Sequence, residues 1–324
     1  MNTKDLNIDI TEPKKQLRLY GYKNYFQTFI KLFIKNMMPH SILITGPRGI
    51  GKSTFVYHIV NYLLSLDEDK KYSINNFLIN KENLSFNLIN NHTHPNFFLV
   101  ENQLLSNDIR IEQIRKLNQF INKSTYSRNL KIIMIDNAEN LNLNASNALL
   151  KSLEEPPKNT FFFLIHNSGS KILDTIKSRC VEFKIFFNEN EKKNIFKNLI
   201  NLHDNNLETY DVLENLYFDT PGNSLRYLVT LSNSNEKNLK NTLSIIFFFI
   251  EKLKSEKKYE NLPYLSFFIE KFYNELILKQ NRNLNVSFLN YKKILYQINN
   301  MKKFNLDKTN TSIWLKDILI NETK

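Results

Sequence analysis

The residues with the clearest chemical meaning lie in one short segment, Gly46-Pro-Arg-Gly-Ile-Gly-Lys-Ser-Thr54, which matches the pattern G-x-x-x-x-G-K-[ST]. Glycines let successive backbone N–H groups face phosphate oxygens, and a helix that starts directly afterwards adds its positive end. In such a loop Lys52 meets the β- and γ-phosphates, Ser53 ligates Mg²⁺, and Thr54 begins the helix. We therefore predict that ATP or ADP with Mg²⁺ binds a loop formed by Gly46, Arg48, Gly49, Gly51, Lys52, Ser53 and Thr54.

The glycine content supports this interpretation. The whole chain has six glycines, and three of them, Gly46, Gly49 and Gly51, lie inside this segment in a stretch of six residues. The alternative is a glycine-rich turn that binds no ligand. The flanking pattern, an apolar run before the segment and an amphipathic run after it, favours the phosphate-binding loop.

A second candidate site is a carboxylate at the end of an apolar run. Lys131-Ile-Ile-Met-Ile-Asp136 reads as a buried strand whose last residue is acidic. At the carboxyl end of a strand beside a phosphate-binding loop, Asp136 would hold Mg²⁺ directly or through water. The alternative is an aspartate that only caps a strand.

These residues need strands and helices to position them. From His40 to Phe187 short apolar runs alternate with amphipathic stretches, which predicts an α/β fold with a largely parallel sheet. The expected strands are 41–45, 97–101, 130–136, 160–166 and 181–186, and the expected helices are 52–66, 109–122 and 143–153. The asparagine-rich stretch 67–91 has no clear period and reads as an insertion with mobile parts.

Beyond Phe187 the pattern becomes helical, with apolar residues at three- and four-residue spacing over 191–202 and 225–231. A polar linker at 232–236 precedes a further helical block, which is punctuated by Pro263. We therefore predict three domains: a nucleotide-binding domain at 1–187, a small helical lid at 188–234 and a C-terminal helical domain at 235–324.

Composition narrows the class of protein. Apolar residues make up 42% and charged residues 23% of the chain, as in an ordinary globular protein. The net charge of +12 suggests polyanions nearby, although lysine-rich coding alone would give the same basic surface. The single cysteine, Cys180, excludes an internal disulfide and a multi-cysteine zinc module. The polar start and the lack of a bilayer-length apolar run predict a cytoplasmic protein without a membrane partner.

Three further segments give a resemblance to a known family. Asn147-Ala-Leu-Leu-Lys-Ser-Leu-Glu-Glu-Pro-Pro157, Thr160-Phe-Phe-Phe-Leu-Ile165 and Ile176-Lys-Ser-Arg-Cys180 together resemble the AAA+ subunits of the bacterial DNA polymerase III clamp loader. The resemblance spans about residues 16–187 and is greatest to the delta-prime subunit. It implies an AAA+ P-loop domain with a parallel sheet, followed by a small helical lid and a C-terminal helical collar.

The resemblance also implies roles for three polar residues. Arg179 would be an arginine finger that reaches the ATP site of a neighbouring subunit, where a planar, permanently charged guanidinium suits phosphate oxygens. Asn167 would occupy the sensor-1 position, and Arg226 would be the sensor-2 arginine of the lid. The alternative for Arg179 is a surface salt bridge, and Thr220-Pro-Gly-Asn-Ser-Leu-Arg226 also has the form of a turn that caps a helix.

One position departs from the AAA+ pattern. The family places a catalytic glutamate directly after the strand-end aspartate, but here that residue is Asn137. An amide cannot act as a general base, so hydrolysis should fall by about 10²- to 10⁴-fold. Glu139 would have to be repositioned to substitute. We therefore expect nucleotide binding with weak or absent turnover.

The resemblance implies a place in a five-subunit ring that loads the sliding clamp onto primed DNA with ATP. Asn137, His94-Pro95 and the short C-terminal collar favour delta-prime over gamma or tau, whereas the intact P-loop and the missing zinc cysteines depart from many delta-prime subunits. A gamma-type subunit that hydrolyses ATP itself is the main alternative. A basic nucleic-acid-binding module with a structural P-loop is a second one.

Overall fold

The computed structural model describes residues 10–102, 108–123, 130–200, 219–232, 241–255, 261–279, 284–304 and 306–323. The chain forms two compact units: the first holds residues 1–206 and 216–229, and the second holds 207–215 and 230–324. Each unit is described by itself. The separation of a lid from the nucleotide-binding domain within the first unit stays a prediction.

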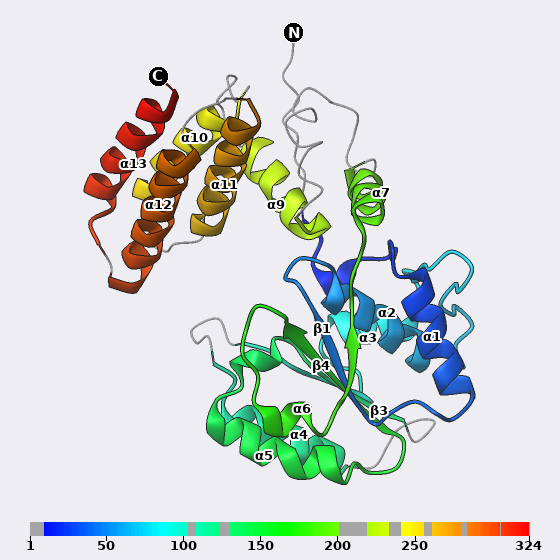
Figure 1. Ribbon diagram of the computed structural model, residues 1–324. Coiled ribbons are helices and arrows are strands. Elements are labelled where there is room, and N and C mark those ends of the chain that lie inside the picture. Colours follow the sequence, from blue (N-terminus) through cyan, green and yellow to red (C-terminus); the bar gives the residue numbers. More distant parts are fainter. Residues whose placement is uncertain are drawn as a thin grey trace. The chain divides into compact units, whose positions relative to one another are not determined.

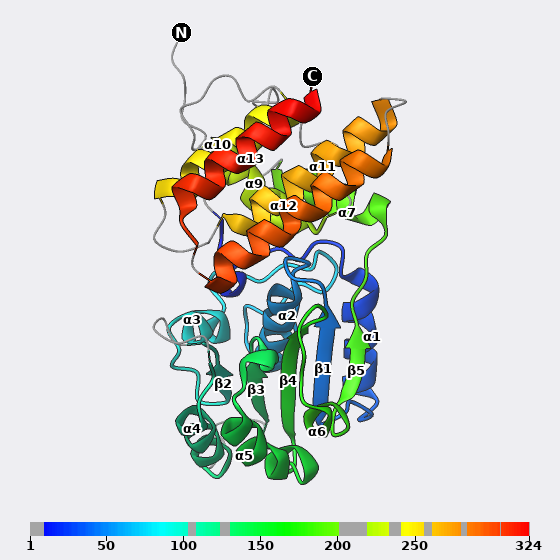
Figure 2. The ribbon, with the colours of Figure 1, turned by 60° about the vertical axis from the view of Figure 1, so that its left-hand side comes forward.

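The centre of the first unit is a parallel sheet. Its five strands are β1 (Ser41–Gly46), β2 (Phe97–Val100), β3 (Lys131–Ile135), β4 (Thr160–Asn167) and β5 (Val181–Lys184), in the spatial order β2-β3-β4-β1-β5. Figure 2 shows the strands side by side in this order. The predicted α/β class and all five predicted strands are confirmed, with ends that differ by at most two residues.

The central strands β1, β3 and β4 are mostly apolar and buried because both faces of the sheet are covered there, whereas the edge strand β5 carries Glu182 and Lys184. Successive side chains alternate between the faces. One face carries Ile42, Ile44, Ile132, Met134, Phe161, Phe163 and Ile165. The other carries Leu43, Ile133, Ile135, Phe162 and Leu164.

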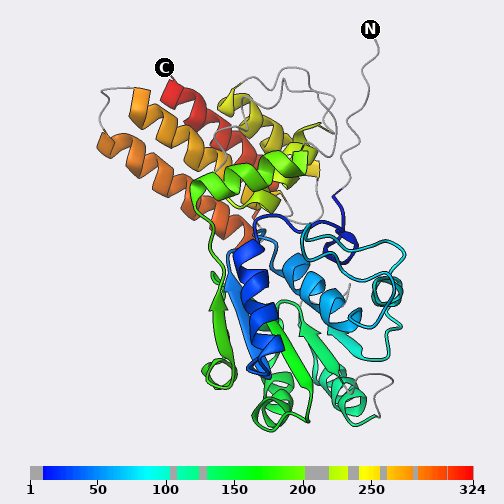
Figure 3. The same cartoon turned by 90° about the vertical axis from the view of Figure 1, so that its right-hand side faces the viewer.

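Helices cover each face of the sheet. Three pack on the first face: α1 (Lys23–Ile34), α2 (Lys52–Leu64) and α3 (Leu84–Asn90). Another three pack on the second face: α4 (Ile111–Ile121), α5 (Leu143–Glu154) and α6 (Asp174–Lys177). Figures 1 and 3 show α1 and α2 in blue on one side of the sheet, opposite α4 and α5. Two short 3₁₀ turns lie at Pro13–Lys15 and Ala138–Asn140.

The asparagine-rich stretch 67–91 was expected to be an insertion without regular structure. Instead it contains the regular helix α3, which packs into the core. The side chain of Asn83 accepts a hydrogen bond from the backbone N–H of Phe86 at 2.7 Å and caps the helix. Asn61 of α2 donates to the same Asn83 oxygen at 2.9 Å. Phe86 and Ile89 are buried. Helix α2 begins at Lys52, the first residue of the predicted helix 52–66.

The first unit also contains α7 (Glu189–Ile200) and most of α9 (Pro221–Ser232), where the sequence predicts helices. Of the predicted linker at 232–236, residues 233–236 lie outside the described residues.

The second unit contains α10 (Thr242–Ser255), α11 (Leu262–Lys279), α12 (Leu284–Phe304) and α13 (Lys308–Thr323). Consecutive helices pack together, and α13 returns to α10. The Phe249 and Phe268 rings stack with their centroids 5.5 Å apart in this core. Pro263 is the second residue of α11, in the first turn, where the missing N–H leaves no helical bond unmade. No helix in the described ranges has the length and apolar character to cross a bilayer.

A buried histidine joins α2 to the chain before β1. His58 is fully buried; its Nδ1 lies 2.9 Å from the Tyr72 hydroxyl and its Nε2 lies 2.9 Å from the carbonyl oxygen of Gln16. The carbonyl can only accept, so Nε2 carries the proton and Nδ1 accepts from Tyr72. Burial lowers the pKa of His58 to about 3, so the ring is neutral in the folded chain at physiological pH.

We predict that His58 makes the fold sensitive to acid. Below its ordinary pKa of 6.5 the unfolded chain binds a proton at His58 that the folded chain does not bind. The free energy of unfolding should therefore fall as pH drops from 6.5 toward 3, by about 1.4 kcal/mol per pH unit from this residue. Urea denaturation between pH 7 and pH 4.5 would measure the free energy of unfolding at each pH. Its slope against pH should be shallower by that amount in His58→Gln than in the wild type. Equal slopes in the two proteins would refute this role.

Candidate nucleotide-binding site

A cavity of about 410 Å³ lies in the first unit where β1, β3 and β4 reach their carboxyl ends. Charged and polar side chains line one part of it: Arg48, Lys52, Ser53, Thr54, Asp136, Asn137, Asn167 and Arg226. Apolar and aromatic side chains line another part: Ile10, Leu19, Tyr20, Tyr22, Ile50, Ile195, Leu199 and Leu225. An apolar cavity with a few convergent polar groups has the character of a small-molecule site.

The predicted loop joins β1 to α2, and other parts of the first unit hold its carbonyl oxygens. Lys52 Nζ donates to the carbonyls of Gly46 and Pro47, each at 2.8 Å. The three carbonyls that follow accept from residues outside the loop: Arg48 O from Thr220 Oγ1 at 2.8 Å, Gly49 O from Gly222 N at 2.9 Å, and Ile50 O from the Tyr22 hydroxyl at 3.0 Å.

These bonds decide where the amides of the loop point. In a trans peptide the C=O and N–H groups face opposite ways, so carbonyls held outward turn the N–H groups inward. The left-handed backbone at Gly49 (φ 82°) and Gly51 (φ 99°) curls the loop, and a side chain would be strained there. The loop therefore has the shape of an anion cradle before any anion binds.

Lys52 is the buried cation of the cavity. Its third hydrogen bond goes to Oδ1 of Asn167 at 2.9 Å. Burial lowers the pKa of Lys52 to about 8, against the opposing effect of the Glu139 and Asp136 carboxylates. The side chain therefore still carries a charge at neutral pH and can bind phosphate.

Ser53 and Asp136 lie together, as the sequence predicts. Ser53 Oγ lies 3.1 Å and 3.0 Å from the two carboxylate oxygens of Asp136. Burial raises the pKa of Asp136, and the hydrogen bond from Ser53 opposes that rise. A hydroxyl beside a carboxylate at the mouth of a phosphate cradle is a donor set that suits Mg²⁺. These residues therefore fit the metal that the loop implies.

Asn137, which directly follows Asp136, belongs to a polar network. Asn137 has left-handed backbone (φ 59°) and begins the short turn that contains Glu139. Asn167, at the end of β4, donates from Nδ2 to Asn137 Oδ1 at 3.1 Å and to Glu139 Oε1. The sequence predicts Asn167 at the site, but it does not predict that Glu139 reaches the same amide.

The start of α9 contacts the loop directly. A Cβ on Gly222 would lie 2.5 Å from the carbonyl oxygen of Gly49, so this close approach requires glycine. Arg226, one turn further along α9, lines the cavity, as a sensor-2 arginine would. The helix-capping alternative for this segment holds as well, because the turn begins α9.

Arg179 lies apart from the cavity. It follows α6 and pairs with the carboxylate of Glu154 at the end of α5. Its NH1 also donates to the carbonyl of Thr175 at 2.8 Å. The side chain remains 30% exposed. The structure therefore shows the surface ion pair, and a role in another subunit's site stays a proposal. Cys180 beside it is partly buried, and burial raises its pKa to about 12.

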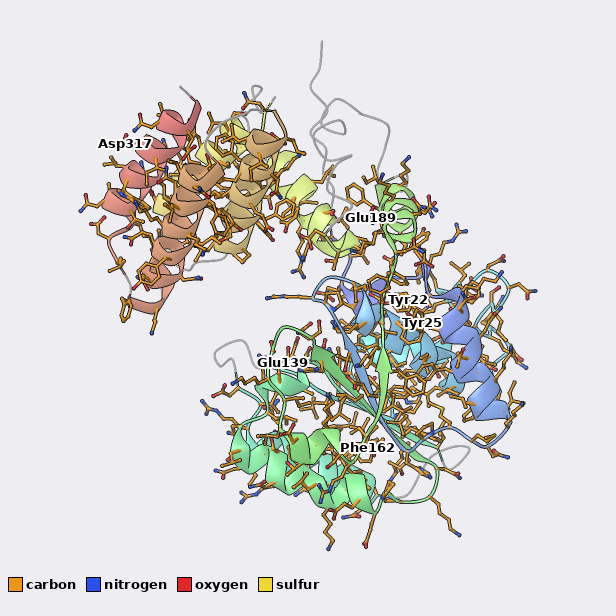
Figure 4. The ribbon with its side chains drawn as sticks, in the orientation of Figure 1. Tyr22, Tyr25, Glu139, Phe162, Glu189 and Asp317 are labelled. Carbon is orange, nitrogen blue, oxygen red and sulfur yellow. The ribbon has the colours of Figure 1, made fainter. Side chains whose placement is uncertain are left out.

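Sequence reasoning missed the residues that shape the loop from outside, above all Tyr22. The Tyr22 ring stacks on Phe55 with the centroids 4.6 Å apart and meets Phe187 edge-on at 4.9 Å. Figure 4 shows Tyr22 and Tyr25 together near the start of α1. Tyr22 comes from an irregular segment without periodicity. The one available signal is a cluster of aromatic residues around Gly21.

A family model and related proteins both match this chain to subunits of DNA polymerase III. Residues 21–188 match the family model described as "DNA polymerase III, delta subunit". The chain is 31% identical over 236 residues to the DNA polymerase III subunit delta' of Buchnera aphidicola subsp. Schizaphis graminum, covering 68% of this chain and 69% of that protein.

Two further proteins are similar over different shares of their length. The delta' subunit of Pseudomonas aeruginosa is 36% identical over 143 residues, which cover 44% of this chain and 42% of that protein. A crystal structure of a gamma subunit-related protein from Thermotoga maritima covers 92% of this chain and 98% of its own, with 15% identity and a TM-score of 0.46. Because the family model matches over half of the chain and the Buchnera relative is matched over two thirds of its length, this chain belongs to the delta-prime subunit family of DNA polymerase III.

Proposed function

We propose that this chain acts as a delta-prime subunit of the DNA polymerase III clamp loader, binding a nucleotide without hydrolysing it efficiently. The observation that carries the proposal is a contrast within one cavity. The phosphate-binding loop is complete and held in shape by its own chain, whereas the position for the general base holds the amide of Asn137.

Binding of the phosphates follows from the groups that line the cavity. The inward amides of the loop and the Lys52 ammonium would contact the phosphate oxygens. Ser53 and Asp136 would hold Mg²⁺, which neutralises phosphate charge when bound. The apolar lining from Leu19, Tyr20 and Leu225 would receive the base and exclude water. None of these groups takes a proton from an attacking water, so the nucleotide would remain bound without efficient hydrolysis.

Arg179 would act on a neighbouring subunit. It lies outside its own cavity, partly exposed, and it is held by Glu154 rather than buried. A guanidinium that leaves a surface carboxylate for a triphosphate exchanges its contacts with one carboxylate oxygen, Glu154 Oε1, for forked bonds to several phosphate oxygens. We therefore propose that this chain supplies an arginine finger in a five-subunit ring that loads the sliding clamp onto primed DNA. The helices of the second unit would form the collar of that ring.

An active gamma-type ATPase is the second candidate, because the complete loop favours it. The two functions differ in whether this chain itself supplies the carboxylate that activates water. In a gamma-type subunit this chain would itself activate water, and the isolated chain would turn over ATP. The amide at Asn137 argues against this.

We predict that the isolated chain binds ADP through Lys52. Lys52→Ala should weaken ADP binding by roughly 10- to 100-fold, because it removes a charge-assisted bond to phosphate. Titration calorimetry with Mg²⁺ would measure this. Lys151→Ala, which removes an exposed lysine from α5, is the matched control and should bind ADP as the wild type does. Equal affinity in Lys52→Ala and the wild type would contradict nucleotide binding at this loop.

We predict slow hydrolysis by the isolated chain. Without a general base, phosphate release from ATP should be about 10²- to 10⁴-fold slower than in an AAA+ subunit that has the carboxylate. A coupled phosphate assay under saturating ATP would measure it, with Lys52→Ala as the background. Turnover at the rate of a carboxylate-bearing subunit would instead support the gamma-type function.

We predict that Arg179 and its partner have different importance in the assembled loader. When the chain is mixed with the other loader subunits of its organism, Arg179→Ala should cause a large loss of ATP-driven clamp loading, and Lys52→Ala a smaller one. Glu154→Gln is the matched control, because it breaks the same ion pair but leaves the guanidinium in place. If Glu154→Gln were as harmful as Arg179→Ala, the pair would be structural and the finger role would be wrong.

A further inference from the structure

Glu139 reaches the sensor-1 amide although it lies three residues after Asp136. Its Oε2 lies 3.3 Å from the backbone N of Asn167, and its Oε1 accepts from Asn167 Nδ2. Both carboxylate oxygens therefore contact one residue. Figure 4 shows Glu139 in the segment that follows β3. Asn167 lines the cavity, whereas Glu139 is not among its lining residues.

The chemistry of the two neighbours fixes how the Asn167 amide is turned. Lys52 can only donate a hydrogen bond, so it must face the amide oxygen. The Glu139 carboxylate accepts, so it must face the amide nitrogen. A flipped amide would place nitrogen against an ammonium and oxygen against a carboxylate. The side chain of Asn167 thus presents its oxygen toward the phosphate-binding loop.

This orientation suits a diphosphate better than a triphosphate. A bound nucleotide needs Lys52 for its own phosphates, which leaves Asn167 Oδ1 without its donor. A γ-phosphate beside that oxygen would then meet an acceptor, and two unshared acceptors in a buried site are costly. Turning the amide over would give the γ-phosphate a donor, but it would press the oxygen against Glu139. ADP lacks the γ-phosphate and avoids both contacts.

Asn137 does not impose the same restriction. Its amide also accepts from Asn167 Nδ2, at 3.1 Å. Because a primary amide has both an oxygen and an NH₂ group, Asn137 can turn with Asn167 and donate to it. A carboxylate cannot make this change while it remains ionised. Of the two neighbours on this side, Glu139 is therefore the one that resists the turn.

We propose that Glu139 is a positioning residue that makes this cavity favour ADP over ATP by holding the Asn167 amide with its oxygen toward the phosphates. This inference rests on the proposed nucleotide binding. It assigns the segment after β3 a role in place of base catalysis, namely selection against the γ-phosphate. Specificity of this kind comes from an unfavourable contact with the excluded ligand.

The test is the ratio of two affinities in Glu139→Gln. Glutamine keeps the shape of the side chain but can donate to a turned Asn167. We expect the ratio of the ATP-analogue Kd to the ADP Kd to fall by roughly fivefold or more, because the buried acceptor gains a partner. ADP affinity itself should change less than about twofold. Calorimetry with Mg²⁺, ADP and the non-hydrolysable analogue AMP-PNP gives both values. Glu155→Gln, an exposed residue at the end of α5, should leave the ratio unchanged.

A double-mutant cycle separates positioning from direct charge repulsion. If Glu139 acts through the amide, Glu139→Gln should have no further effect on the ratio in an Asn167→Ala background. If the carboxylate repels the γ-phosphate directly, the effect persists in that background and the positioning role is overturned. Thermal unfolding of each variant shows that the fold is retained.

The remaining outcomes separate the inference from the proposed function. ADP binding that depends on Lys52, together with an unchanged ratio in Glu139→Gln, would overturn the role of Glu139 and leave nucleotide binding intact. Absence of binding of either nucleotide by the wild-type chain would overturn both. A ratio that falls in Glu139→Gln alone, and not in Glu155→Gln, supports the inference.

Discussion

The candidate site depends on one constraint: the carbonyl oxygens of Arg48, Gly49 and Ile50 in the phosphate-binding loop must be satisfied from outside the loop. Tyr22, Thr220 and Gly222 supply three of these bonds, from segments about 28 to 173 residues away along the chain. An unsatisfied buried carbonyl is costly, so these partners favour one loop shape over others. The core that places Tyr22 and α9 is thereby linked to the direction in which the loop amides point.

Local patterns in the sequence were enough to predict the sheet and the phosphate-binding loop of this architecture. The central strands β1, β3 and β4 are mostly apolar runs buried on both faces, and β4 alone carries Phe161, Phe162 and Phe163, so their positions could be predicted without knowing their neighbours. The loop could be predicted because its chemistry needs glycines and a lysine at fixed spacing. In contrast, α3 lacks a clear apolar period and is defined by tertiary bonds such as that from Asn61 to Asn83.

The unpredicted parts of the site depend on contacts between distant segments. No spacing in the sequence indicates that the Tyr22 hydroxyl bonds the Ile50 carbonyl, or that Gly222 packs against Gly49. The same holds for the pairing of Arg179 with Glu154, two residues separated by a helix end, β4 and α6. Sequence patterns report periodicity and residue type, whereas these contacts depend on how the sheet brings its edges together.

Asn137 links two features of the proposed nucleotide site: the lack of a carboxylate directly after Asp136, and the contact of Glu139 with Asn167. In the proposed function it stands where a carboxylate would activate water, and its left-handed backbone (φ 59°, ψ 60°) turns the chain into the short 3₁₀ segment Ala138–Asn140. Asparagine adopts this conformation more readily than glutamate does, because its short side chain tolerates the left-handed region. The turn brings Glu139 back beneath β4, where it meets Asn167. Under the proposed function, asparagine at this position therefore has two consequences: it supplies no base, and its left-handed backbone favours the turn that delivers Glu139 to Asn167.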